Sequence, residues 1–137
     1  MVTVLTRHEL AIASEDDLVV VRRRVKQAAM QRKLNTFAIA AITTAASELT
    51  RNAWVHGGGG KAIVEELSEG ARYGVRVVFE DFGPGIPDVP RVLAGGYSTT
   101  KTLGLGVSGS KRLVDRFEIE SIVGKGTRVL IEKWALF

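Results

Sequence analysis

The chain contains no cysteine, and this absence excludes several kinds of chemistry at once. Disulfide bonds, thiolate metal sites and thiol catalysis all require that residue. Long hydrophobic runs are absent too, because no apolar stretch approaches the ~18 residues of a membrane span. The first residues also lack the apolar core of a signal peptide. We therefore expect a cytoplasmic protein that makes no use of a membrane.

The composition that remains is typical of one compact globular domain. The chain has 137 residues, of which 45% are hydrophobic and 25% are charged. A chain of this size and apolar content can bury a real core, whereas a second domain would need more residues. We expect residues 1–137 to form a single domain.

Basic residues are in excess, with a formal net charge of +4, and they are densest in the run "VRRRVKQAAMQRK". Leu18, Val21 and Val25 recur there at helical spacing, so the run predicts an amphipathic helix. Its cations can be a solvated face, a protein-docking surface or a nucleic-acid site. Aromatic residues and nucleic-acid motifs are missing from the run, so we expect no nucleic-acid partner.

Hydrophobic periodicity and turn residues predict an α+β domain. Consecutive strands joined by tight turns indicate a mixed, mainly antiparallel sheet, and the helices between them can cover one of its faces. We expect a two-layer α/β sandwich with three helices on one face. The expected strands are residues 2–12, 61–66, 73–82, 117–123 and 127–134, and the expected helices are residues 16–33, 36–56 and 106–116.

One carboxylate interrupts the apolar face of a predicted strand. Val75, Val77 and Phe79 share a parity, and Asp81 is the next residue of that parity. Since alternate side chains of a strand point to the same face, Asp81 should point where the core residues point. A buried carboxylate is costly unless hydrogen-bond donors face it. Parity alone therefore shows that Asp81 needs a hydrogen-bond donor and does not identify that donor.

A second group of polar residues follows one side of the second predicted helix. Glu48, Asn52 and His56 are spaced at i, i+4 and i+8, beside an apolar stripe. Glutamate can accept a proton, and the asparagine oxygen suits Mg²⁺. The same residues could be an ordinary solvated flank, and the helix alone leaves both interpretations open.

Glycines precede the third predicted helix. Gly104 and Gly106 in "GLGVSGSKR" are expected at the helix start, where free N–H groups and the helix dipole favour an anion. Lys101 lies close by and could meet a phosphate. The stretch is not a Walker loop, and no strand runs directly into it as a dinucleotide fingerprint requires.

Taken in order, four motifs resemble the N, G1, G2 and G3 boxes of the GHKL ATP-binding fold, which gyrase, Hsp90, MutL and histidine kinases share. They are "ELTRNAWVH", "EDFGPGIPD", "TLGLGVSGSKRLVD" and "GKGT". Within that superfamily the chain is similar to the short serine/threonine kinases that act as anti-sigma factors or as RsbT-type switch kinases of the stressosome.

The resemblance implies ATP and Mg²⁺ as cofactors and assigns a base pocket. Asp81 would accept the exocyclic amine of adenine and would have no protein partner until adenine binds, with Thr127 in the same network. Gly83 and Gly85 would let the backbone pass close to the purine, and Ile86 would form a wall of the pocket.

The resemblance also assigns the phosphate end of the site. Asn52 would coordinate Mg²⁺, and Glu48 would act as the general base that accepts a proton from the substrate hydroxyl. Residues 89–103 would form a lid, with Gly95 and Gly96 as hinges. The implied phosphate contacts are Lys101, Gly104, Leu105, Gly106 and Val107.

For function, the resemblance implies a serine/threonine kinase that phosphorylates STAS-domain antagonist or scaffold proteins. A sigma factor or a PP2C-type phosphatase would be an alternative docking partner, and a homodimer is compatible with the resemblance. Two alternatives stay open: a mainly non-catalytic module whose docking depends on ATP, and a histidine-kinase-like ATP domain.

Overall fold

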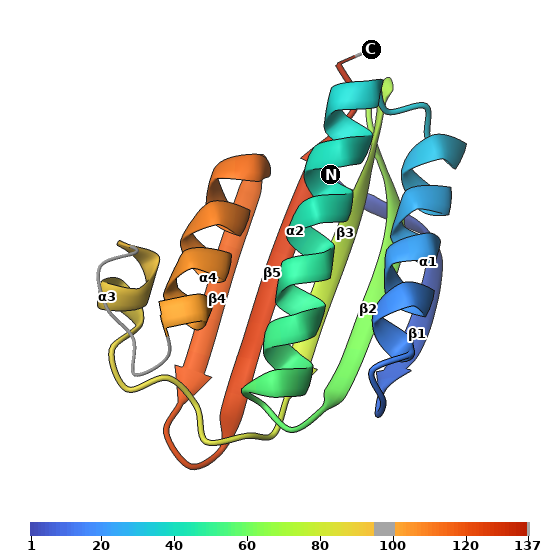
Figure 1. Ribbon diagram of the computed structural model, residues 1–137. Coiled ribbons are helices and arrows are strands. Elements are labelled where there is room, and N and C mark those ends of the chain that lie inside the picture. Colours follow the sequence, from blue (N-terminus) through green and yellow to red (C-terminus); the bar gives the residue numbers. More distant parts are fainter. Residues whose placement is uncertain (95–100, 137) are drawn as a thin grey trace.

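The computed structural model describes residues 1–94 and 101–136, without the side chains of residues 101–105. Its strands form one sheet in the order β1-β2-β3-β5-β4, in which every neighbouring pair is antiparallel. The helices all lie on one face of this sheet (Figure 1). The predicted α+β sandwich is confirmed. The bounds are β1 Thr3–Ile12, α1 Asp17–Gln31, α2 Thr36–Val55, β2 Gly60–Glu69, β3 Arg72–Asp81, α3 Val89–Leu93, α4 Lys101–Leu113, β4 Arg116–Ile122 and β5 Gly126–Trp134.

The core lies between the sheet and the helices. The alternation of side chains in the sequence correctly predicts which face of β3 is buried. Val75, Val77 and Phe79 of β3 are buried in the main apolar cluster, together with Ile42 and Leu49 of α2. Asn35 sets the start of α2, because its side chain accepts a hydrogen bond from Ala38 N at 2.8 Å. Because α2 packs on β3, Asp81 and the polar residues of α2 lie toward the same end of the sheet.

The opposite face of the sheet carries charged pairs above a small apolar cluster. Arg76 Nε donates to Glu132 Oε2 at 2.7 Å, and Glu132 is almost completely buried. Ile63, Val78 and Leu130 are buried beside them. Charged side chains with long aliphatic stems can cover such a cluster without a helix layer.

The segment after β3 differs from the expected one in its helices. Residues 89–93, at the start of the expected lid, form the short helix α3, whose first turn is capped by the Asp88 side chain accepting from Arg91 N at 3.1 Å. The next helix begins at Lys101, five residues before the expected start at Gly106. Glycines lower helix propensity, but packing of α4 on α2 overrides that preference. The expected hinges Gly95 and Gly96 lie outside the described residues.

No helix in the described ranges is long and apolar enough to cross a membrane. The cytoplasmic location stays a prediction.

Candidate functional site

The last residue of β3 begins a row of three polar side chains that crosses three strands. Asp81 is paired in register with Thr127 of β5, and Thr127 is paired with Ser121 of β4. All three have the parity that faces the helix layer. The row thus forms one wall of a site at the end of the sheet where α2 also ends.

Asp81 is half-buried and has a backbone partner, which corrects the expectation that only a ligand could supply a donor. Gly83 N–H donates to Asp81 Oδ1 at 3.0 Å, because the chain turns back immediately after β3. Burial raises the pKa of Asp81 above its ordinary value of 3.8, while the backbone N–H groups of Gly83 and Thr127 act in the opposite direction. The carboxylate therefore has backbone N–H groups of the protein as partners.

Two glycines allow α2 and the loop after β3 to approach Asp81 closely. A Cβ atom on Gly57 would lie 2.6 Å from Asp81 Oδ2, inside any real contact distance. A Cβ atom on Gly83 would lie 2.6 Å from Gly57 Cα. The carboxylate is therefore held between two backbone segments that tolerate no side chain.

Gly57→Ala is expected to displace the Asp81 carboxylate and to weaken nucleotide binding by about tenfold or more, since that group loses its hydrogen-bond geometry. Affinity for ATP, measured by calorimetric titration, checks this. Gly109→Ala is the matched control, because a Cβ atom at Gly109 meets nothing within 4 Å. Equal ATP affinity in Gly57→Ala and the wild type would contradict the predicted contact of Asp81 with a nucleotide.

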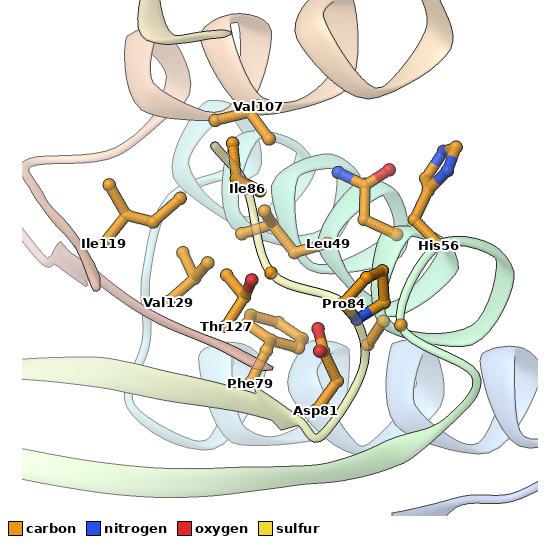
Figure 2. A pocket seen from close by; sticks show the side chains of 14 residues that line it. Leu49, His56, Phe79, Asp81, Pro84, Ile86, Val107, Ile119, Thr127 and Val129 are labelled. Carbon is orange, nitrogen blue, oxygen red and sulfur yellow. The ribbon is translucent and has the colours of Figure 1, made fainter. Parts of the chain in front are cut away.

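The cavity beside Asp81 is mostly apolar and small. Ile86 and Val107 lie across from Phe79 and the Asp81 carboxylate, which points into the cavity (Figure 2). The cavity volume is about 40 Å³, room for a few water molecules. The remaining lining residues are Leu49, Asn52, Ala53, His56, Gly57, Pro84, Gly85, Ile119, Thr127 and Val129.

Two polar residues of α2, Glu48 and Asn52, face α4 next to this cavity. A Cβ atom on Gly106 would lie 3.3 Å from Glu48 Oε2 and 3.4 Å from Asn52 Nδ2, so the glycine lets the two helices meet. Within the described part of the chain, the buried Nδ2 atom of Asn52 has no hydrogen-bond partner. A buried amide without a partner is rare and points to a missing ligand. Glu48 is more exposed and bonds Arg51 Nη1 at 3.4 Å.

This arrangement places a half-buried carboxylate and an unsatisfied amide around one cavity, with a second carboxylate one helical turn from the amide. Residues 12–133 match the model of the histidine kinase-like ATPase domain. The chain belongs to the histidine kinase-like ATPase family. It is also 39% identical over 123 residues to the serine/threonine-protein kinase RsbT of Bacillus subtilis (strain 168), covering 90% of this chain and 92% of that protein. The family prediction from the four motifs is confirmed, and membership in an ATPase family implies ATP binding.

Gly106 and Val107, which were predicted to bind phosphate at the start of a helix, lie inside α4 instead. Gly106 and Val107 are in the second turn of α4, where backbone N–H groups bond within the helix. Their donation to a phosphate would require the start of α4 to rearrange, so these contacts stay predictions. The predicted contacts of Lys101, Gly104 and Leu105 lie outside the residues whose side chains are described.

Ser121 and Gly57 lie next to Thr127 and Asp81, although neither residue was predicted from the sequence. The missing side chain of Gly57 makes room for Asp81. Ser121 shares the inward parity of Phe117 and Ile119 in "FEIESIV", and that parity could have revealed it. His56, which had no assigned role, also lines the cavity.

Proposed function

We propose that the protein is an ATP-dependent serine/threonine protein kinase of the switch-kinase type. The observation that carries this proposal is that Glu48 and the unpartnered Asn52 amide lie one turn apart on α2, beside the cavity that Asp81 also lines. The kinase relative, which aligns over most of the chain, supports the same activity. The proposed substrates are STAS-domain antagonist or scaffold proteins.

The proposed roles follow the two ends of the site. The Asp81 carboxylate accepts the amine of adenine, and Thr127 completes the base-reading edge. The purine lies against Ile86, and the absence of side chains on Gly83 and Gly85 lets the backbone approach it. At the other end Glu48 takes the proton of the attacking hydroxyl, which is the main chemical task that phosphoryl transfer leaves to a side chain.

The residues present fit Mg²⁺ only as a partner of bound phosphates. The described ranges contain no cluster of three or more His, Asp or Glu side chains that could hold a metal ion. Asn52 would hold the ion through its amide oxygen, as suits a metal that keeps phosphate and water ligands. Mg²⁺ would neutralise charge on the phosphates when bound.

Incubation with γ-labelled ATP, Mg²⁺ and STAS-domain proteins tests the proposal. Acid-stable label on serine or threonine is the expected result. Acid-labile label would indicate a histidine-kinase-like activity instead. ATP binding without any transfer would favour a module whose docking depends on ATP.

The basic face of α1 supports a protein partner with acidic surface residues. Arg22, Arg23 and Lys26 share this face and form no ion pair with any described residue, whereas the nearby Arg32 pairs with Glu66 at 2.6 Å. Unpaired cations on one helix favour association with opposite charge. We propose that the substrate protein, or the alternative sigma-factor or phosphatase partner, docks on this face.

Arg22→Glu is expected to lower phosphoryl transfer to the substrate protein while leaving ATP affinity unchanged. Arg22 lines a groove of about 200 Å³ between α1 and α2 that also includes Arg51, the partner of Glu48. Docking there would bring a substrate hydroxyl toward Glu48. Steady-state transfer rates check the effect, and we expect about a tenfold rise in KM from the reversed charge. Arg7→Glu, on the opposite face of the sheet, is the control.

A further inference from the structure

The loop after β3 lies against the hairpin that joins β4 to β5. Gly124 N–H donates to the carbonyl oxygen of Pro84 at 2.8 Å. Gly85 has a φ of 78°, and a Cβ atom there would lie 2.5 Å from the carbonyl oxygen of Ile122. Pro84 and Gly85 both line the cavity beside Asp81, so this wall of the cavity rests on the hairpin.

A side chain of β4 extends this contact to the next residue of the loop. Ser121 Oγ accepts a hydrogen bond from Ile86 N–H at 2.7 Å and donates one to the carbonyl oxygen of Gly126 at 3.2 Å. Thr127 Oγ1 lies 2.8 Å from the same Ser121 oxygen. Ser121 thus links the loop to the first two residues of β5.

The N–H group of Ile86 depends on this acceptor, because Ile86 is only 8% exposed. The Ile86 side chain packs with Val92 and Val107 and lines the cavity (Figure 2). A buried N–H group without an acceptor is costly, so without the Ser121 hydroxyl the loop would have to shift until water reached that group. Such a shift would move the Ile86 side chain with its backbone and change the shape of the cavity.

We propose that Ser121 is a positioning residue that holds Ile86 in place as a wall of the base-binding cavity. The inference rests on the proposed function, because it requires the purine to lie against Ile86. Ser121 acts through the backbone of Ile86 and does not itself touch the base.

Ser121→Ala tests the inference by calorimetric titration with ATP and Mg²⁺, which measures the affinity and the stoichiometry of binding separately. We expect ATP affinity to fall about five- to tenfold, as for one hydrogen bond, with unchanged stoichiometry. Ser121→Thr retains the hydroxyl and should bind ATP like the wild type. Ser68→Ala is the matched control, because Ser68 of β2 pairs with Tyr73, at the end of the sheet far from Asp81.

A merely structural role of Ser121 would give a different result. Part of the Ser121→Ala protein would then be unfolded, so the stoichiometry would fall while the folded fraction kept the wild-type affinity. That result would overturn the inference. Equal losses of affinity in Ser121→Ala and Ser121→Thr would overturn it too, because the hydroxyl would not be the group responsible.

A double-mutant cycle with Ile86→Ala tests the route by which Ser121 acts. If Ser121 acts by placing the Ile86 side chain, Ser121→Ala should change ATP affinity by less than about twofold once that side chain is absent. Additive losses would overturn the inference while leaving the proposed function intact. A wild-type protein that did not bind ATP would instead overturn the proposed function, and the inference with it.

Discussion

Replacing Glu48 with glutamine is expected to reduce phosphoryl transfer about a thousandfold, within the range that a general base contributes. Glutamine has nearly the same shape but cannot take a proton from the attacking hydroxyl. Its neutral amide also removes a negative charge near the phosphates, so ATP affinity should be unchanged or slightly higher. Single-turnover transfer of labelled phosphate and a separate ATP titration measure the two effects.

Glu9→Gln is the matched control for this experiment. Glu9 lies on the face of β1 that points away from the helices, where it pairs with Lys61 at 2.8 Å, whereas Glu48 lies next to Gly106 of α4 and one turn from Asn52. The control should keep normal transfer, because its carboxylate does not face the phosphate end. Full transfer by Glu48→Gln would refute the general-base role without touching the assignment of the nucleotide pocket.

The fold could be predicted from the sequence where local patterns and packing agree. The alternation of Val75, Val77 and Phe79 and the helical stripe of Ile42 and Leu49 each identify a buried face, and the structure packs these faces together. The polar exceptions to these patterns, Asp81 of β3 and Asn52 of α2, line one cavity. They meet there because β3 and α2 both end at the same end of the sheet. Patterns that conflict with burial thus pointed to the site before its geometry was known.

The remaining features depend on contacts that no local pattern contains. The early start of α4 follows from its packing on α2 at Gly106, a tertiary effect that outweighs the low helix propensity of glycine. Gly57 is important because Asp81 lies against it, although the two residues are far apart in the chain. Ser121 reads as an ordinary strand residue until the register places it beside Thr127. Residues of this kind are recognised only after the strands are paired.

Asp81→Asn is expected to lower ATP affinity about a hundredfold, because its amide would place a donor against the donating 6-amine of adenine. The same amide can donate to a 6-oxo group, so the variant should prefer inosine triphosphate over ATP, the reverse of the wild type. Titrations with both nucleotides measure this reversal. Weak binding of both nucleotides by a folded variant would show that Asp81 supports the pocket without reading the base.

Without ATP, the Asp81→Asn variant should be at least as stable to unfolding as the wild type, because of how Asp81 titrates. Burial raises its folded-state pKa above 3.8, so between the unfolded and folded pKa values the folded state holds a proton that the unfolded state has released. The free energy of unfolding therefore declines as pH rises through that window, and the decline persists at neutral pH. Asparagine removes it, so thermal unfolding near pH 7 should occur at the wild-type temperature or above. A lower unfolding temperature would mean that the Asp81 charge stabilises the fold through its backbone donors. A variant that is equally stable and no longer selects ATP would show that the buried charge is retained for recognition.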